Sequence, residues 1–544
     1  METVEGKIVD VVTKTIFEGK ISFENGVIKS VEHCSTNNKL YIMPGLVDSH
    51  IHIESSMLTP QRFAEKALLH GVISVVADPH EIANVLGVDG VRYMINDAEK
   101  SPMKFFFGVP SCVPATSFET SGAVLNSVDV EKLLHDDKIV CLSEMMNFPG
   151  VLNKDPEVMA KIDAAKSLNK PIDGHAPGLD SKQVEQYCAS GISTDHECFL
   201  IDDARTKINN GMMIQLREGS AAKNLDTLAP LFHEFPDKLM LCSDDYHPED
   251  LNRTYLFERV ARLISKGYDF FDVLRAATYN PIAHYGLSVG LIQENSPADF
   301  VLVDDIKSFT IRQVFINGNK VVNNGTICYQ MEESKVINKF HCKKISAKDL
   351  SVPAVKGKVR VIDVIDKELI TKQLQLTIPI VNNNFGFDLR HDIIKIVVLN
   401  RYTVSSKPAV GFIHGFHLKF GAIASCISHD SHNIICVGAD DDSIVKAVNT
   451  VVRNRGGLAV CTGSNVFDLP LPIGGIMSNV SCETIAQQYL QLTSICRALG
   501  CNLTAPFMTL SFMALPVIPS LKITDKGLFD VEKFDFVSVS VLKK

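Results

Sequence analysis

The chain has 544 residues, with 54 basic and 63 acidic side chains and a formal net charge of −9 at pH 7. Hydrophobic residues make up 46% of the chain and charged residues 22%, which excludes a largely disordered protein. Because there is no basic excess, we expect neither nucleic acid nor a membrane as a partner. At ~150 residues per domain, the length predicts about three to four domains.

Cysteine usage points to a reducing compartment. The 14 cysteines are scattered and include no Cys-x-x-Cys pair, so neither a zinc knuckle nor a redox motif is indicated. The N-terminus lacks the pattern of a secretion signal, and the most apolar stretch, residues 507–519, is too short to span a bilayer. We therefore expect a cytoplasmic protein.

Short strands with turn signals lie on both flanks of the first 335 residues. They are expected at residues 7–12, 19–23 and 27–31, and again at 298–303, 311–316 and 320–322. The shared character of the two stretches predicts one small composite β-domain, formed by residues 1–47 together with 298–335.

The region between these flanks alternates apolar runs with amphipathic stretches. Strands are expected at residues 41–47, 72–77, 104–109, 138–142, 171–172, 192–194, 212–216 and 238–242. Helices are expected between them, for example at residues 60–70, 155–169, 180–190 and 250–266. Near-continuous apolar strands separated by helices are typical of a parallel sheet covered by helices. The pattern predicts the α/β class and a (β/α)₈ TIM-type barrel over residues 48–297.

A charged linker, residues 330–348, precedes a third region of mixed character. In that region, strands are expected at residues 359–365, 393–399 and 433–437, and helices at 441–454 and 482–499. Residues 350–544 are therefore expected to form a C-terminal α+β domain.

Most expected barrel strands end in residues of the types that bind metals. These residues are Asp48, His50, His52, Asp78, His80, Glu144, His175, His196, Glu197, Asp244 and Asp245. The C-terminal ends of parallel barrel strands meet at one face, where active sites are built. We therefore expect these side chains to converge.

The spacing of His50 and His52 indicates a metal site, because residues i and i+2 of a strand point to the same side. We expect Glu144 to bridge two ions, since a carboxylate can offer one oxygen to each. His175 and His196 are expected to hold the second ion, with Asp244 near the attacking water. Imidazole and carboxylate ligands suit Zn²⁺, Mn²⁺ or Fe²⁺.

Other polar residues leave two interpretations open. Asp78 and His80 could bind metal or substrate, or only hydrogen-bond around the strand end. Arg217 and Glu218 could contact substrate or form an ion pair that fixes their loop. His247 is expected to be an exposed loop residue. The run 428–433 could be a functional loop or a solvated turn.

Several motifs carry a resemblance to a known family. The run Pro44-Gly45-Leu46-Val47-Asp48-Ser49-His50-Ile51-His52 resembles the first-strand signature of the amidohydrolase superfamily of metallo-dependent hydrolases. Three further motifs, Asp78-Pro79-His80-Glu81-Ile82, Arg217-Glu218-Gly219-Ser220-Ala221-Ala222 and Ser428-His429-Asp430-Ser431-His432-Asn433, are similar to those of the bacterial adenine deaminases. The similarity extends over almost the whole chain.

The resemblance implies hydrolytic deamination of adenine to hypoxanthine and ammonia, a purine-salvage reaction in which metal-activated hydroxide attacks C6. Two divalent ions are implied, usually Mn²⁺ or Fe²⁺, with Zn²⁺ as a further option. The expected partners are adenine and water, and a homo-oligomer is left open. Glu144 stands where many superfamily members carry a carboxylated lysine, which argues against the hydantoinase and dihydroorotase branches.

Within this reaction, Asp244 is expected to accept the water proton and pass it to the departing amino group. Glu218 is the first choice for an acid near ring N1, with Asp245 behind it. The expected metal ligands are His50, His52, Glu144, His175, His196 and Asp244. The residues expected to contact substrate or to form a lid over the barrel mouth are Asp78, His80, Arg217, Ser220, His429, Asp430 and His432.

Two alternatives remain at this stage. One is another amidohydrolase reaction, on a cyclic amide. The other is a metal-binding protein without turnover, which would keep the ligands but need no proton shuttle.

Overall fold

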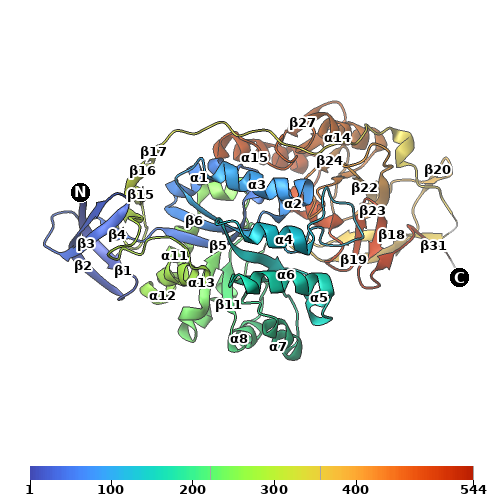
Figure 1. Ribbon diagram of the computed structural model, residues 1–544. Helices are drawn as coiled ribbons and strands as arrows, with labels where there is room; N and C mark the ends of the chain where they lie inside the picture. The colour runs from blue at the N-terminus through green and yellow to red at the C-terminus, as the bar shows by residue number, and fades with distance from the viewer. Residues whose placement is uncertain (221, 356, 543–544) are drawn as a thin grey trace. The chain divides into compact units, whose positions relative to one another are not determined.

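The computed structural model describes residues 1–220, 222–355 and 357–542, and the chain divides into two compact units (Figure 1). The first unit contains Met1–His80, Val91–Cys112 and Leu125–Ser334. The second contains Lys335–Lys544 together with two short segments, Glu81–Gly90 and Val113–Val124. The sequence analysis placed both short segments inside the barrel region, because each lies between two expected barrel strands.

The first unit contains an eight-stranded sheet that combines strands from both flanks of the barrel. Its order is β17-β16-β15-β14-β4-β1-β2-β3. The strands are β1 (Glu2–Asp10), β2 (Thr15–Glu24), β3 (Val27–His33), β4 (Tyr41–Met43), β14 (Phe300–Val303), β15 (Ile311–Ile316), β16 (Asn319–Asn323) and β17 (Thr326–Ile327). Strand β4 joins the flanks, because it pairs with β1 on one side and with β14 on the other. Ile8, Ile21, Phe23, Phe300 and Phe315 pack together in the core of this sheet.

The barrel strands of the first unit are parallel. They are β5 (Leu46–His52), β6 (Val72–Ala77), β7 (Lys104–Val109), β8 (Ile139–Met145), β9 (Ile172–Gly174), β10 (Thr194–Asp195), β11 (Met213–Arg217) and β12 (Leu239–Cys242). A short strand, β13 (Asp244–Asp245), pairs with β5. Two backbone hydrogen bonds join the strand groups: Ser193 N–H donates to Ile172 C=O (2.8 Å), and Ser243 N–H donates to His50 C=O (3.3 Å). The predicted TIM-type barrel is therefore confirmed.

Helices follow the barrel strands along the chain. They are α1 (Pro60–Leu69), α2 (His80–Leu86), α3 (Val88–Ala98), α4 (Ser127–Leu134), α5 (Phe148–Leu152), α6 (Pro156–Ser167), α7 (Ser181–Ala189), α8 (Ile201–Asn209), α9 (Leu225–Leu228), α10 (Pro248–Arg253), α11 (Leu256–Ser265), α12 (Phe270–Ala276) and α13 (Tyr279–Tyr285). The local sequence determines where several helices begin. The Asp155 and Asp180 side chains accept hydrogen bonds from backbone N–H groups in the first turns of α6 and α7.

The first predicted strand, residues 41–47, is wrong in one respect. The chain forms two strands there: β4 in the flanking sheet and β5 in the barrel. Pro44 separates them, because proline has no N–H to continue a ladder. Gly45 follows, where a Cβ atom would lie 2.5 Å from the Ile73 side chain. As a result, His50 and His52 belong to β5 itself rather than to the loop after it.

The second unit is built on a large, mostly antiparallel sheet of order β19-β18-β23-β22-β25-β24-β26-β27. Its strands are β18 (Gly357–Val364), β19 (Thr371–Leu376), β22 (Ile394–Leu399), β23 (Ala409–His414), β24 (Ala422–Ser425), β25 (Ile434–Gly438), β26 (Leu458–Cys461) and β27 (Val466–Leu469), with β31 (Ser540–Leu542) paired to β18. Helix α14 (Asp441–Asn454) buries Ile444, Val448 and Val451 in the core that includes β24 to β26.

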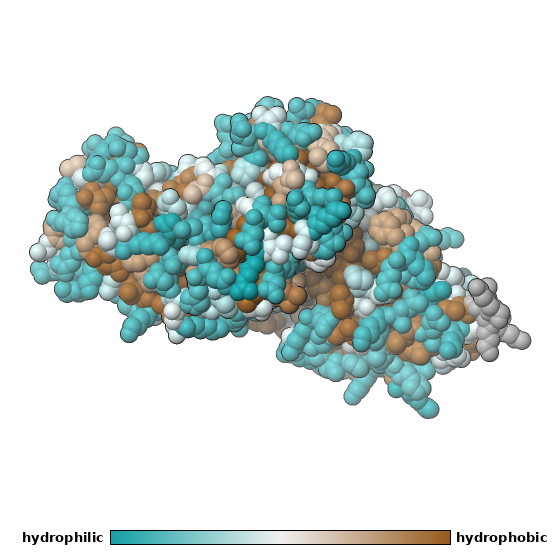
Figure 2. All heavy atoms as spheres, turned by 90° about the horizontal axis from the view of Figure 1, so that it is seen from below, coloured by the Kyte–Doolittle hydropathy of each residue, from teal (hydrophilic) through white to brown (hydrophobic). Residues whose placement is uncertain are grey.

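The remaining elements complete an α+β unit, as predicted. They are α15 (Cys482–Ala498), α16 (Pro506–Ser511), the small sheet β28 (Leu521–Thr524), β29 (Gly527–Asp530) and β30 (Asp535–Phe536), and the pair β20 (Ile380–Val381) and β21 (Asn384–Phe385). In the described part of the chain, no helix combines the length and apolar character needed to cross a membrane. Hydrophilic side chains cover most of the face in Figure 2, and apolar ones form small patches.

Candidate metal centre

The six side chains expected to bind metal all lie in the first unit and come together in overlapping groups. The groups are His52, Asp78, His80 and Glu144; His50, His196 and Asp244; and Glu144, His175 and His196. Within each group, the candidate ligand atoms lie within 4.8 Å of one another. All these side chains are buried except that of His175, which is 28% exposed. Residues separated by almost two hundred positions thus share one small volume.

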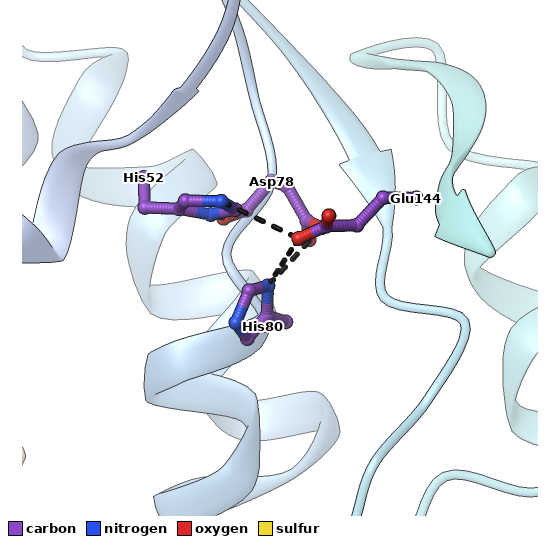
Figure 3. A group of neighbouring side chains, drawn as sticks. All are labelled: His52, Asp78, His80 and Glu144. Atoms are coloured by element: carbon purple, nitrogen blue, oxygen red, sulfur yellow. Dashed lines mark hydrogen bonds and ion pairs between the residues drawn. The ribbon is translucent and has the colours of Figure 1, made fainter. Parts of the chain in front are cut away.

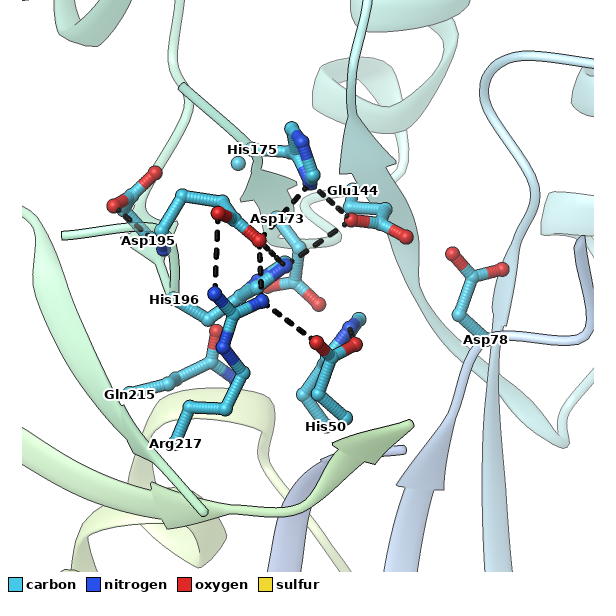
Figure 4. Close-up of polar contacts among 12 residues, drawn as sticks. His50, Asp78, Glu144, Asp173, His175, Asp195, His196, Gln215 and Arg217 are labelled. Carbon is cyan, nitrogen blue, oxygen red and sulfur yellow. Dashed lines mark hydrogen bonds and ion pairs between the residues drawn. The ribbon is translucent and has the colours of Figure 1, made fainter. Parts of the chain in front are cut away.

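Glu144, near the end of β8, lies between two sets of imidazoles. Its Oε1 is 3.4 Å from His52 Nε2 and 3.3 Å from His80 Nδ1. Its Oε2 is 2.8 Å from His175 Nδ1 and 3.2 Å from His196 Nε2 (Figure 4). Each oxygen therefore faces its own set of nitrogens, which is the arrangement that a carboxylate bridging two cations requires.

Asp78 and His80 lie in the same group as His52 and Glu144 (Figure 3). His80 Nδ1 is 3.2 Å from Asp78 Oδ2. The main-chain carbonyl of Asp78 accepts a hydrogen bond from His52 Nδ1 over 3.0 Å. Since a carbonyl can only accept, Nδ1 is the donor, and Nε2 is the nitrogen that faces Glu144.

Asp244 begins β13 and turns its two oxygens to different partners. Oδ1 is 3.0 Å from His52 Nε2 and 3.6 Å from His50 Nε2. Oδ2 accepts a 2.7 Å hydrogen bond from Arg217 Nη1. The backbone of Asp244 has φ of 57°, a left-handed conformation that is uncommon for residues other than glycine and that clusters at functional sites.

The surrounding charges keep both carboxylates ionised. Burial alone would raise the pKa of Glu144, but the imidazoles of His175 and His196 hold it well below its usual range. Burial would likewise raise the pKa of Asp244, but the guanidinium of Arg217, together with His50 and His52, holds it well below its usual range. Both groups are therefore anionic at neutral pH, as metal-binding carboxylates must be.

Buried hydrogen bonds fix the strand ends that carry these ligands. Asp48 accepts from the Ser243 hydroxyl, from Tyr255 Oη (2.7 Å) and from the backbone N–H of His50 (3.3 Å). Asp195, which directly precedes His196 in the sequence, is buried and forms an ion pair with Lys207 at 3.0 Å. Burial would raise the pKa of Asp195, but Lys207 lowers it to about 2.

The donor set fits divalent cations. It combines imidazole nitrogens and carboxylate oxygens, which suit Mn²⁺, Fe²⁺ or Zn²⁺. Two further atoms support the fit: among the described residues, His50 Nε2 and Asp78 Oδ1 are buried and have no hydrogen-bond partner. A buried polar atom without a partner costs about 1–3 kcal/mol, a cost that a bound cation would remove.

The carboxyls considered for the acid near N1 lie in different surroundings. Asp245 forms a group with His52 and Asp244, and its Oδ1 accepts a 2.5 Å hydrogen bond from Ser55. Glu218 pairs with Arg262 at 2.7 Å, and Lys223 lies 3.5 Å away. Of the two interpretations left open for Arg217 and Glu218, the ion pair between them is not formed, because each side chain has other partners.

Two other loop residues belong to the first unit. The Ser220 hydroxyl donates to Asp250 (2.7 Å) and accepts the N–H of His247 (2.9 Å). The expectation that His247 is exposed is wrong, since this residue is only 8% exposed. Two contacts accompany this burial. The backbone N–H of His247 donates to the Ser220 hydroxyl, and its Nδ1 lies 3.6 Å from Glu249 Oε1.

The run 428–433 lies in the second unit and is buried throughout, which excludes a solvated turn. His429 Nδ1 and His432 Nε2 each hydrogen-bond to one oxygen of Glu81, which belongs to the same unit. Asp430 is buried too. Burial raises the pKa of the Glu119 carboxyl well above its usual value, and the nearby charge of Asp430 raises it further.

The sequence predicts no role for Asn224 or Glu81, and it predicts only convergence with the other strand-end residues for Glu197. In the structure Glu197 pairs with Arg217, Asn224 binds the backbone around both, and Glu81 hydrogen-bonds to His429 and His432. Glu81 directly follows His80 at a strand end, which is the signal that could have drawn attention to it. Nothing in the sequence around Asn224 marks it.

Comparison with known proteins gives full-length similarity. Residues 41–321 match the amidohydrolase family, and residues 368–535 match the adenine deaminase C-terminal domain. The chain is 49% identical to an adenine deaminase of Methanosarcina mazei, over 99% of both chains. It is 48% identical to one of Salinibacter ruber, over 98% of both, and 46% identical to one of Borreliella burgdorferi, over 98% of this chain and 99% of the other.

Solved structures similar to this chain are more distant. A β-aspartyl dipeptidase of Fervidobacterium islandicum AW-1 matches with a TM-score of 0.48 and 16% identity, over 61% of this chain and 100% of that one. An N-acetylglucosamine-6-phosphate deacetylase of Thermotoga maritima matches with a TM-score of 0.45 and 14% identity, over 59% and 100%.

Proposed function

This chain belongs to the adenine deaminase family of the amidohydrolases, and on that premise we propose that it hydrolyses adenine with water to hypoxanthine and ammonia. The observation that carries the proposal is the position of Glu144 between two sets of imidazoles, with Asp244 beside them. The near full-length likeness to adenine deaminases indicates the substrate.

Two divalent ions, Mn²⁺ or Fe²⁺ with Zn²⁺ as a further option, are proposed as the cofactors. The residues that would hold them are His50, His52, Glu144, His175, His196 and Asp244, and Asp78 and His80 lie against the same donor atoms. When bound, such ions lower the pKa of coordinated water and so supply hydroxide at neutral pH.

Asp244 is proposed to move the proton. Its carboxylate is anionic before reaction, so it can accept a proton from the attacking water and pass it to the amino group that leaves C6. Of the two carboxyls considered for N1, we propose Asp245, because it lies in a group with His52 and Asp244, whereas Glu218 already pairs with Arg262.

Other residues are proposed to bind substrate or to exclude water. Arg217 is buried beside Asp244, and Ser220 hydrogen-bonds within the loop that follows β11. His429, Asp430 and His432 are proposed to act as a lid. This role is supported by the density of buried polar side chains in the run 428–433, where both histidines hydrogen-bond to Glu81 of the same unit.

The cellular compartment is proposed to be the reducing cytoplasm. All the cysteines are free, and most are buried, which is typical of cytosolic proteins.

A direct assay separates this function from its rivals. The purified, Mn²⁺-loaded protein should release ammonia and hypoxanthine from adenine in a 1:1 ratio. Ring opening of dihydroorotate or a hydantoin, without ammonia from adenine, would identify the cyclic-amide reaction instead. Tight metal binding with no turnover of any of the three compounds would identify a binding protein.

A further inference from the structure

Glu197, Arg217 and Asp244 form an acid–arginine–acid chain in which the reaction described above gives Glu197 no role. Arg217 ends β11 and is only 3% exposed. Its Nη1 donates both to Glu197 Oε1 and to Asp244 Oδ2, the latter over 2.7 Å, and its Nη2 donates to Glu197 Oε2 over 3.2 Å. Glu197 thus accepts from both terminal nitrogens of the guanidinium, and Asp244 accepts a second hydrogen bond from Nη1.

The backbone around this chain is braced by Asn224, which is 1% exposed. Its Nδ2 donates to the carbonyls of His196 and Cys198, both over 2.9 Å, on either side of Glu197. Its Oδ1 accepts the N–H of Arg217 over 2.6 Å. One amide therefore ties the end of β11 to the loop after β10 and fixes the spacing of Glu197 and Arg217.

We infer that Glu197 is a positioning residue: acting through Arg217, it fixes the rotamer of Asp244. Because Arg217 holds Oδ2, Oδ1 is the oxygen left facing His52 and His50, at 3.0 and 3.6 Å. The inference rests on the proposed function, since Asp244 matters to the rate only if it moves the proton there.

The geometry also explains why the middle residue is arginine. A planar guanidinium can meet two carboxylates from fixed directions, whereas a lysine ammonium is a point charge on a flexible stem. Misplacing a reacting group by about 1 Å can cost about 100-fold in rate. The contribution of Glu197 is therefore expected in kcat more than in KM, because it fixes a group that moves a proton.

The test combines single and double variants. Glu197→Gln should lower kcat about 10- to 100-fold with KM nearly unchanged, and Arg217→Met should lower kcat at least as far. A rise in KM of Arg217→Met alone would report the substrate contact proposed for Arg217. If Asp244 is positioned by Glu197 through Arg217, the double variant should be no slower than Arg217→Met alone. Glu197 Oε1 also lies 3.8 Å from His175 Nδ1 and 3.5 Å from His196 Nε2, so the Mn²⁺ affinity of Glu197→Gln must be measured to separate this direct contact from the route through Arg217. The kcat of Arg217→Lys should stay close to that of Arg217→Met, because lysine restores the positive charge but not the planar, two-nitrogen geometry of the guanidinium.

A matched control comes from the exposed pair on the same unit, where Arg205 contacts Glu234 through Nε and Nη2. Arg205→Met should keep kcat within about twofold of the wild type. Thermal unfolding of every variant in the metal-free form shows whether a loss of rate is a loss of folding. Chelator competition for Mn²⁺ reports the state of the ligands without adenine.

The outcomes distinguish the inference from the function on which it rests. A wild-type protein that does not deaminate adenine contradicts the proposed function. An active wild type with Glu197→Gln equally active contradicts the inference. Losses that multiply in the double variant would show that Glu197 acts independently of Arg217, and full activity of Arg217→Lys would show that charge alone suffices. Either result overturns the positioning role.

Discussion

The Nδ1–H of His52 donates to the main-chain carbonyl of Asp78 over 3.0 Å, which turns Nε2 of His52 toward Glu144 and Asp244. The backbone of the neighbouring strand end thereby decides which nitrogen of this imidazole faces the two carboxylates. Such outer hydrogen bonds orient metal-ligating imidazoles.

Replacing Glu144 by alanine should remove metal as well as activity. This carboxylate faces imidazoles on both sides, so its loss affects both groups of donor atoms. Metal analysis after purification should find fewer than two ions per chain. Glu185→Ala, at an exposed position of α7, is the control and should keep the full metal content. Full metal content in Glu144→Ala would contradict the bridging role.

Asp244→Asn should separate metal binding from turnover. The amide keeps the shape of the side chain and one oxygen but cannot accept the water proton, so kcat should fall about 100- to 10,000-fold. Metal content, measured on the same preparation, should stay near that of the wild type. A variant that keeps its kcat would rule out Asp244 as the proton carrier.

Metal uptake by the metal-free protein should release protons. Burial alone would lower the pKa of His175, but Glu197 and Glu144 raise it to about 9. Below that pH the imidazole carries a proton that a cation must displace, so apparent affinity should fall as pH falls from about 9. Calorimetry of Mn²⁺ binding in buffers of different ionisation enthalpy measures the release. Binding without any dependence on the buffer would refute it.

The acid near N1 can be assigned by comparing two variants. Asp245→Asn should lower kcat about 100-fold, because Asp245 lies in a group with His52 and Asp244. Glu218→Gln weakens the contact with Arg262, so its larger effect is expected on the unfolding temperature. If Glu218→Gln lowered kcat more than Asp245→Asn, the assignment would be reversed.

Lys522 should make stability depend on pH. This buried lysine donates to the carbonyls of Leu369 and Phe512, and burial lowers its pKa to about 7. The unfolded value is about 10.4, so between pH 7 and 10 the unfolded chain binds more protons and the free energy of unfolding rises with pH.

The comparison with a variant isolates this contribution. Lys522→Met should lose the rise between pH 7 and 10 relative to the wild type, whereas Lys372→Met, at an exposed position of β19, should keep it. Chemical denaturation at several pH values gives both curves. Identical slopes in the wild type and Lys522→Met would show that this lysine stays charged in the folded protein.

Much of the fold could be predicted from local pattern. Strand β6 is apolar and buried along its whole length, as expected of a parallel strand covered on both faces. Helices α6 and α14 begin where aspartate caps stand. The split between β4 and β5 was missed, because the apolar run continues across Pro44 and only the pairing partners differ.

The site was less predictable where partners are distant in sequence. The position of His50 and His52 follows from strand periodicity, and the other ligands from the rule that strand ends meet. The partners of Arg217 and the burial of His247 depend on which loops pack together, which no local pattern specifies. The same holds for the contact of Glu81 with His429, across 348 positions of sequence.

Reconstitution tests the central claim most directly. Metal-free protein should be loaded in turn with Mn²⁺, Fe²⁺ and Zn²⁺, and ions per chain measured beside hypoxanthine formed from adenine. The account predicts that turnover rises with the second equivalent of Mn²⁺ or Fe²⁺ and falls to background on its removal. Full turnover of adenine by the metal-free protein, or none at any metal loading, would contradict it.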